Sequence, residues 1–335
     1  WYVYLYRGDI SILATHYEGM KKYLEFLDTM DMDRISDLGL GDWCPPTGGA
    51  DKPETPVEVT STGYYYIDAK TVAEAARLLG YEEDYKYYSA LAEEIRQAFI
   101  AKFLTPTDGK YKYETQTALS CALYQGIAKD DLKQPVLEKL LKTVEQYNYH
   151  LNCGILGTKY IMRCLTDLDQ AEVAYKIAAQ EDFPSWGNWV RQGATTLWET
   201  WNADASLNHI MFGDIGGWFY QAIGGLTPDP EAPGFKHFKV KPFVVGEVTW
   251  AKVDHQSIYG LINIYWRVED GKFKLSLTVP TNTTATVLLP TLNIDSVTEN
   301  GVAVAKAAGI SDIKICCNRT KLEAASGTYE FECRL

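Results

Sequence analysis

The spacing of the apolar residues changes near residue 225, and no other feature of the sequence constrains the fold as strongly. Before that point apolar residues recur every three or four positions, as at Ile10, Leu13, Tyr17 and Met20, which is the period of a buried helix face. Beyond the Pro-rich segment 226–234, apolar and polar residues alternate, which is the period of a half-buried strand. The sequence therefore predicts a helical part followed by a β part.

The helical part predicts about nine helices. They are expected at 10–27, 62–79, 83–103, 116–125, 135–147, 157–165, 169–180, 186–191 and 206–223. Successive helix pairs form a bundle, a superhelix or an α/α toroid whose inner helices line a central pit. A closed toroid of six pairs needs twelve helices, so about nine helices would leave it incomplete.

The β part predicts a sandwich. The run from Ile262 to Trp266 alternates with polar residues, and a second alternating run begins at Phe273 beyond the turn Asp270-Gly271, so the two runs form a hairpin. Further strands are expected at 236–241, 247–253, 285–289, 295–299, 302–305, 313–317 and 328–334, with a second hairpin turn at Asn300-Gly301. Many short strands in about 100 residues are typical of a β-sandwich. We therefore expect one domain over 1–227 and a second over 235–335.

The charge of the chain argues against several classes of partner. Its 32 Lys and Arg against 44 Asp and Glu give a net charge of −12, which repels phosphate backbones and anionic lipid surfaces. No stretch approaches the roughly 18 apolar residues of a membrane-spanning helix. The common signatures of nucleotide binding, zinc proteases and serine hydrolases do not occur in the sequence. We expect neither nucleic acid nor membrane as a partner, and the sequence does not indicate an oligomeric state.

The seven cysteines include no C-x-x-C pair, so neither a zinc site nor a dithiol redox motif of that type is predicted. An odd number of cysteines in a chain of this size favours reduced, buried thiols, which fits a reducing compartment. No acidic loop with the pattern of a calcium site is present, and we expect no bound metal.

Tryptophan is concentrated in residues 183–218, which hold five of the nine indoles. Flat apolar faces with polar edges suit sugar rings, but they also build protein cores. Glu199 stands in this segment, flanked by Trp198 and Trp201. A carboxylate among indoles is poorly hydrated, which suits an acid or base catalyst. The alternative is a structural Glu199 that pairs with Arg191 or caps a helix.

Two further places combine polar and aromatic groups. His209 is suited to donate a hydrogen bond to a substrate hydroxyl or to orient Glu199, or else it packs in the core. Asp42 and Trp43 stand in the long loop Gly41–Pro53, where the carboxylate either accepts hydrogen bonds from sugar hydroxyls or organises its own turn. Inverting glycosidases use two carboxyl groups about 6.5–9.5 Å apart, and only Asp42 and Glu199 lie in aromatic settings of this kind.

A set of short motifs is distributed over the whole chain. They are Trp1-Tyr-Val-Tyr-Leu-Tyr-Arg-Gly-Asp9, Gly41-Asp-Trp43, Thr115-Gln-Thr117, Gly154-Ile-Leu-Gly-Thr158, Pro184-Ser-Trp-Gly187, Gly193-Ala-Thr-Thr-Leu-Trp-Glu-Thr-Trp201, Ser206-Leu-Asn-His209, Val248-Thr-Trp-Ala251, Tyr259-Gly260 and Val279-Pro-Thr-Asn-Thr-Thr-Ala285. In this order and spacing the motifs resemble those of the bacterial α-L-rhamnosidases of glycoside hydrolase family 78. The Ala-Thr-Thr-x-Trp-Glu and Ser-x-Asn-His blocks together make the resemblance specific.

The resemblance implies an α plus β multidomain fold, in which an (α/α)6 toroid, incomplete at its N-terminal side, precedes an antiparallel β-sandwich. It implies inverting release of terminal α-L-rhamnose from a rhamnose-containing oligosaccharide or glycoside, with no cofactor. The matched site residues are Glu199 as general base and, as sugar contacts, Asp42, Trp43, Trp186, Trp201 and His209.

The chain also departs from the family pattern. The general acid of the family lies in an Asp-Glu-Arg-Leu-Gly-Trp type of motif upstream of the position of Trp1, and no such motif occurs in this sequence. We therefore expect a C-terminal portion of the enzyme, weakly active or inactive by itself. Asn188 replaces an aromatic residue of many relatives, which affects the aglycone side of the pocket. The alternatives are another toroid glycosidase, with Asp42 as acid and Glu199 as base, and a non-catalytic carbohydrate-binding protein.

Overall fold

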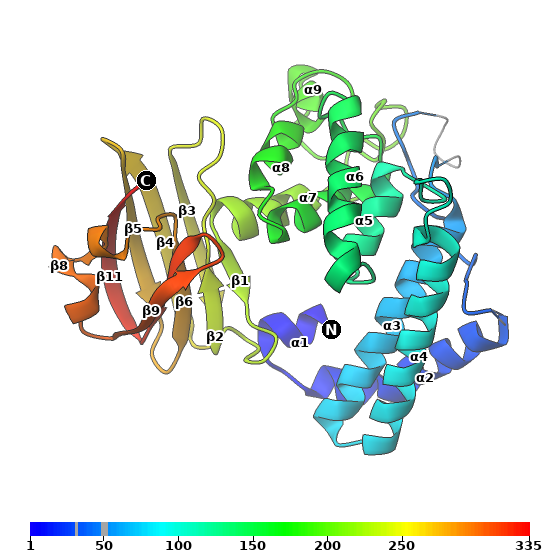
Figure 1. Ribbon diagram of the computed structural model, residues 1–335, viewed down its shortest axis with the longest axis horizontal. Helices are drawn as coiled ribbons and strands as arrows, with labels where there is room; N and C mark the ends of the chain where they lie inside the picture. The colour runs from blue at the N-terminus through cyan, green and yellow to red at the C-terminus, as the bar shows by residue number, and fades with distance from the viewer. Residues whose placement is uncertain (31–32, 48–52) are drawn as a thin grey trace. The chain divides into compact units, whose positions relative to one another are not determined.

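A computed structural model of the protein describes residues 1–30, 33–47 and 53–335 (Figure 1). The chain divides into two compact units, one formed by Leu13–Ile215 and the other by Trp1–Ile12 together with Gly216–Leu335. The first unit is helical, and most of the second is built from strands, which confirms the two fold classes that the change of period predicts. Residues 48–52 of the predicted loop lie outside the described residues.

The helical unit is built from α2 to α9. Their bounds are α2 (Ser11–Met30), α3 (Val57–Leu79), α4 (Glu82–Phe99), α5 (Gln116–Tyr124), α6 (Lys133–Gln146), α7 (Ile155–Asp167), α8 (Ala171–Ala178) and α9 (Trp186–Arg191). Helix α4 continues as the π-helix Ile100–Leu104. Helix α3 packs along α4, and α5 packs between α6 and α7, so the unit is a series of helical hairpins.

The helix bounds follow from local chemistry. Thr115 and Ser185 precede α5 and α9, and their hydroxyls accept hydrogen bonds from backbone N–H groups of the first turn, which satisfies donors that a helix leaves open. Helix α3 ends at Gly80, whose φ of 81° is the left-handed conformation that glycine adopts without a Cβ clash. These helices lie where the apolar period predicts them.

The strands form two sheets. Their bounds are β1 (Leu226–Pro228), β2 (His237–Val240), β3 (Trp250–Ser257), β4 (Gly260–Glu269), β5 (Lys272–Val279), β6 (Thr284–Leu289), β7 (Thr298–Glu299), β8 (Val302–Ala303), β9 (Ile310–Cys316), β10 (Arg319–Ala324) and β11 (Gly327–Arg334). One sheet has the order β1-β2-β6-β10-β9 and the other β3-β4-β5-β11-β7-β8. All strand pairs are antiparallel except β2 with β6, which are parallel. The predicted antiparallel sandwich is therefore correct apart from this one pair.

The predicted hairpin is present as β4 and β5. Trp266 pairs with Leu275 across the two strands, and both side chains are fully buried. Asp270 and Gly271 have φ values of 51° and 70°, the two positive values of a type I′ turn, which follows the right-handed twist of the strands. The Asp-Gly signal and the period of two therefore locate this hairpin correctly.

Four elements differ from the prediction: two predictions are wrong, and two elements are not predicted. The helix expected over 206–223 is reduced to α10 (Asp214–Trp218) and the π-helix Phe219–Ile223, while 206–209 pairs with 197–199 by backbone hydrogen bonds. The sequence pattern does not predict α1 (Tyr2–Arg7) or β10, and it assigns β1 to a linker. Helix α1 is held within its unit by the hydrogen bond from Gly234 N to Leu5 O, at 2.8 Å. Such long-range contacts decide short elements, because local propensity is weak over six residues.

Candidate functional site

Asp42 lies at the N-terminus of α7, and both oxygens of its carboxylate accept hydrogen bonds from the protein itself. Oδ1 accepts hydrogen bonds from the N–H groups of Leu156 and Gly157, at 2.9 and 2.8 Å. Oδ2 accepts from the Gly154 N–H at 2.8 Å and from the Thr117 hydroxyl at 2.5 Å. The first N–H groups of a helix have no partner within it and form the positive end of its dipole. Asp42 therefore fastens the loop to the start of α7.

The electrostatics of Asp42 reflect two opposed effects. The side chain is only 2% exposed, and this burial raises the pKa of the Asp42 carboxyl, while the bonds from Gly157, Thr117, Gly154 and Leu156 lower it. An ionised carboxylate has about four acceptor positions, and here four donors occupy them. In this structure Asp42 has no position left for a sugar hydroxyl, so its predicted sugar contact stays a prediction that these bonds do not favour.

The contact between the loop and α7 leaves no space for side chains. A Cβ at Gly154 would lie 2.1 Å from the backbone oxygen of Trp43, and a Cβ at Gly157 would lie 2.2 Å from the hydroxyl oxygen of Thr117. The N–H of Ile155 also donates to the Trp43 oxygen at 2.9 Å. The two glycines of the Gly154-Ile-Leu-Gly157 motif are therefore required by close backbone approach.

Glu199 and His209 lie on two segments that pair like short strands. The Glu199 N–H donates to the Ser206 oxygen, and the His209 N–H donates to the Leu197 oxygen, both at 2.9 Å. Oε2 of Glu199 accepts from the Ser206 N–H at 3.1 Å, and among the described residues Oε1 accepts no hydrogen bond. The half-buried Glu199 is therefore held in place through one oxygen, and the described residues leave the other without a hydrogen bond.

The hydrogen bond to His209 defines the tautomer of its neutral ring. Nδ1 of the half-buried imidazole accepts from the Met211 N–H at 3.1 Å. An acceptor nitrogen carries no proton, so the proton of the neutral ring is on Nε2. His209 thus presents a donor. The alternative pairing of Arg191 with Glu199 is not found, because Arg191 donates to Glu181 at 3.2 Å.

Three carboxylates act electrostatically on the thiol of Cys44. The pKa of Cys44 is raised to about 11, first by burial and then by the charges of Glu199, Asp204 and Asp42, in that order. Each of the three carboxylates therefore lies within electrostatic reach of one buried sulfur. This brings Glu199 and the Gly41-Asp-Trp43 motif into the same part of the helical unit, although 157 positions separate Asp42 from Glu199 in the sequence (199 minus 42).

The indoles near Glu199 form a core. Trp201 stacks on Trp189, with ring centroids 4.8 Å apart, and also contacts Phe212 at 4.3 Å. Trp186 meets Trp201 edge to face. Their N–H groups donate to backbone oxygens of Cys153 and Phe212, and Trp201 is 1% exposed. The predicted contact of Trp186 and Trp201 with a sugar stays a prediction, and in the structure both indoles are packed in this core.

One carboxylate beside this region was not singled out in the sequence. Glu54 accepts a hydrogen bond from the side-chain amide of Asn152 at 2.5 Å, and the same amide lies 3.0 Å from the Tyr147 hydroxyl. Burial raises the pKa of Glu54, while the bonds from Asn152 and Tyr147 lower it. Asn152 lies two positions before Gly154, which binds Asp42. No local pattern predicts this cluster, because Glu54 lies 98 positions from Asn152 in the sequence.

A cleft of about 320 Å³ lies beside the loop, lined among others by Gly41, Tyr64, Asp68 and Leu156. None of the six predicted site residues lines it. In the part of the chain that the structure describes, no group of three or more His, Cys, Asp or Glu side chains is arranged to hold a metal ion. No helix of that part is both long and apolar enough to cross a membrane.

Comparison with known proteins gives consistent matches for both parts of the chain. Residues 1–223 match the family model described as the bacterial alpha-L-rhamnosidase 6 hairpin glycosidase domain. Residues 225–303 match the model of the bacterial alpha-L-rhamnosidase C-terminal domain. The chain is 30% identical over 348 aligned residues to an alpha-L-rhamnosidase of Formosa agariphila, covering 100% of this chain and 37% of that protein.

Two solved structures are similar over nearly the whole chain. An alpha-L-rhamnosidase from Dictyoglumus thermophilum superposes with a TM-score of 0.90 at 36% identity, covering 100% of this chain and 38% of the other. The Streptomyces avermitilis alpha-L-rhamnosidase, solved in complex with L-rhamnose, gives a TM-score of 0.90 at 30% identity, covering 99% of this chain and 32% of the other. The chain thus spans about a third of the length of the relatives that it matches.

Proposed function

Because this chain belongs to the bacterial α-L-rhamnosidase family, we propose that it forms part of an enzyme that hydrolyses terminal α-L-rhamnosides with inversion at the anomeric carbon. The observation that carries the proposal is the state of Glu199. Its carboxylate is half-buried and fixed through Oε2 by the Ser206 N–H, while Oε1 accepts no hydrogen bond from the residues that the structure describes. A base that activates water needs a fixed orientation and one accessible oxygen.

In the proposed reaction Glu199 is the general base. Its Oε1 takes a proton from a water molecule as the water oxygen attacks the anomeric carbon. The bond between that carbon and the leaving oxygen breaks on the opposite side, and a general acid protonates the leaving oxygen. We assign this acid to the upstream motif that the family resemblance implies. The chain alone would then turn over rhamnosides poorly, since the two carboxyl groups act together.

The remaining site residues position the sugar or the base. Nε2 of His209 carries the proton of the neutral ring and is suited to donate to a rhamnose hydroxyl. The half-buried Trp43 offers an apolar face to the 6-methyl group. Asp42 fixes the backbone that presents Trp43, and Trp186 and Trp201 support the Glu199 segment from within the core.

The alternative in which Asp42 is the acid has weaker support. A general acid must reach the leaving oxygen and release its proton to it. The carboxylate of Asp42 instead accepts four hydrogen bonds inside the protein. Sugar binding without catalysis is the other alternative, and the experiment below distinguishes it.

The test compares Glu199→Gln with Asp204→Asn, a matched change at a neighbouring carboxylate, in a version extended upstream to include the acid motif. With a chromogenic aryl α-L-rhamnoside, we expect Glu199→Gln to lower kcat by about 10²–10⁴-fold and to leave rhamnose affinity unchanged. Asp204→Asn should retain most of the activity. NMR should show that the rhamnose anomer of inverted configuration is the first product released. Turnover by Glu199→Gln within tenfold of the unchanged protein would refute the role. An extended protein that binds rhamnose and never hydrolyses the glycoside would favour a binding protein.

A further inference from the structure

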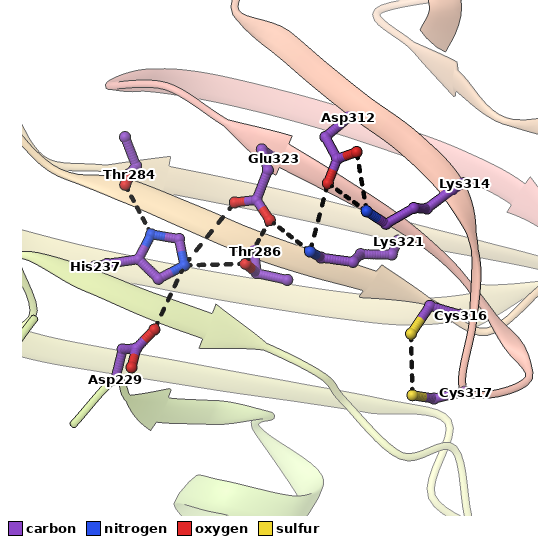
Figure 2. A network of polar contacts seen from close by, with 10 residues as sticks. All are labelled: Asp229, His237, Thr284, Thr286, Asp312, Lys314, Cys316, Cys317, Lys321 and Glu323. Carbon is purple, nitrogen blue, oxygen red and sulfur yellow. Dashed lines mark hydrogen bonds and ion pairs between the residues drawn. The ribbon is translucent and has the colours of Figure 1, made fainter. Parts of the chain in front are cut away.

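Two adjacent cysteines form a pair of thiols at the end of a hairpin in the β unit. The sulfurs of Cys316 and Cys317 lie 3.1 Å apart, in hydrogen-bond contact. Figure 2 shows the two side chains pointing toward one another where β9 ends. The proposed rhamnosidase reaction does not use either residue, because all the residues assigned to that reaction belong to the helical unit.

The turn holds the two thiols together. Cys316 is the last residue of β9 and pairs with Arg319, the first residue of β10. The two residues between them, Cys317 and Asn318, have φ values of 53° and 54°, which makes a two-residue type I′ turn. A cysteine rarely adopts positive φ. The conformation is therefore set by the hairpin, and it places the sulfur of Cys317 against that of Cys316.

Accessibility separates this pair from the other cysteines. Cys317 is exposed and Cys316 is half-buried. The other five are buried and are Cys44, Cys121, Cys153, Cys164 and Cys333. Burial raises the pKa of each of these five thiols, and reactions with disulfides proceed through the thiolate and require access. The expectation of buried thiols is therefore correct for five cysteines and wrong for the hairpin pair.

We propose that Cys316 and Cys317 are a redox modification site that small-molecule disulfides convert to a bond between adjacent residues. The Cys317 thiolate attacks one sulfur of the oxidant, whose S–S bond breaks, and the first small thiol leaves with the proton that Cys317 loses. The Cys316 thiolate then attacks the sulfur of Cys317 in this mixed disulfide. The second small thiol leaves with the proton of Cys316, so the oxidant gains the two electrons and two protons that the cysteines lose.

The bond formed in this way is readily reduced. Bonding requires the sulfurs to approach by roughly 1 Å, from 3.1 Å to the usual S–S length of about 2.05 Å. Adjacent Cα atoms are about 3.8 Å apart, below the usual range of about 4.4–6.8 Å for bridged cysteines. The backbone must adjust to close the ring, and strained bridges are the labile ones. The site therefore cycles between two states and does not lock the fold.

The experiment treats the full 335-residue chain with glutathione disulfide and follows the intact mass and the peptide map. We expect the unchanged chain to lose two hydrogen atoms, mapped to Cys316 and Cys317, and to regain them with a mild dithiol. Cys316→Ser lacks the second thiol and should accumulate one glutathione on Cys317. Cys317→Ser should react much more slowly, and the buried-site control Cys333→Ser should behave like the unchanged chain.

Each other outcome overturns the proposal. A stable glutathione adduct on the unchanged chain would show that Cys316 does not resolve the mixed disulfide. An unmodified pair would show that the thiols are not reactive, and a bridge between other cysteines would place the chemistry elsewhere. Circular dichroism checks that the two serine variants fold like the unchanged chain. We expect unchanged spectra, because both substitutions lie at a turn and change one atom.

Discussion

Replacing Asp42 by asparagine keeps the size of the side chain and removes its charge, so the change tests whether this carboxylate acts on the fold or on a sugar. The amide is best placed with its nitrogen toward Thr117, whose hydroxyl can turn to accept. The N–H of Gly154 then faces another N–H, while Leu156 and Gly157 keep their acceptor. One hydrogen bond to a charged group is lost, and the attraction between the charge and the α7 dipole is lost with it.

The cost follows from these two losses. A buried hydrogen bond to a charged group contributes about 1.5–3 kcal/mol, and a charge at a helix N-terminus adds about 0.3–1 kcal/mol. We expect Asp42→Asn to lower the free energy of unfolding of the helical unit by about 2–4 kcal/mol. Asp42→Ala would leave several buried N–H groups without an acceptor. The resulting loss of stability would approach the whole free energy of unfolding of a domain, about 5–15 kcal/mol. Asparagine is therefore the useful substitution.

The assay is urea denaturation followed by tryptophan fluorescence, because the indoles of Trp189 and Trp201 are buried in the same unit. Asp204→Asn is the control. Asp204 is exposed and accepts one bond from the Thr200 hydroxyl, which the amide oxygen can still accept, so its change should stay within about 0.5 kcal/mol. If the free energy of unfolding of Asp42→Asn is within about 1 kcal/mol of that of the unchanged chain, the anchoring role is refuted. A loss of rhamnose affinity without a loss of stability would instead support the sugar contact.

Two further predictions concern the helical unit. Gly157→Ala should destabilise it by at least about 2 kcal/mol, since the new Cβ would lie 2.2 Å from the Thr117 hydroxyl. The control Gly19→Ala in α2, where nothing lies within 4 Å of the new Cβ, should stabilise the unit by about 0.5–1 kcal/mol. Equal midpoints of urea unfolding for the two variants would contradict this. Burial raises the pKa of Asp68 to about 6 from 3.8, so folding favours the neutral carboxyl. The stability that the neutral carboxyl contributes is fully present below about pH 4 and is lost as the pH rises through 6. Asp68→Asn should therefore stabilise the unit by about 2–3 kcal/mol at pH 8 and should leave its stability nearly unchanged at pH 4. A stability gain of the same size at both pH values would show that the Asp68 charge is not the cause.

The local pattern was sufficient for the regular elements. The helical period at Leu13 and Tyr17 reports the buried face of α2, and the alternation around Trp266 reports the inward face of β4. The Asp270-Gly271 turn needs only the positive φ of two residues. These features depend on neighbours within a few positions, so a single sequence carries them.

The pattern failed where distant contacts decide the structure. Helix α1 is six residues long and is held by Gly234, and the segment 206–209, predicted as helix, pairs with 197–199. The sequence also does not show that the Trp186 and Trp201 rings pack on one another, and their predicted sugar contact stays a prediction. Composition counts aromatic residues, but it does not distinguish an indole that faces solvent from one that faces a core.

By itself the sequence determined the succession of a helical and a β part, most elements within them, and the motifs that identify the family. The tertiary structure decided what the chemically active groups do. Asp42 finds its partners 75 and 115 positions away, at Thr117 and Gly157, and the neighbouring thiols of Cys316 and Cys317 meet because a turn brings them together. Periodicity records which face of an element is buried, whereas the bonds of a carboxylate or thiol depend on backbone atoms that only the folded chain brings within 3 Å.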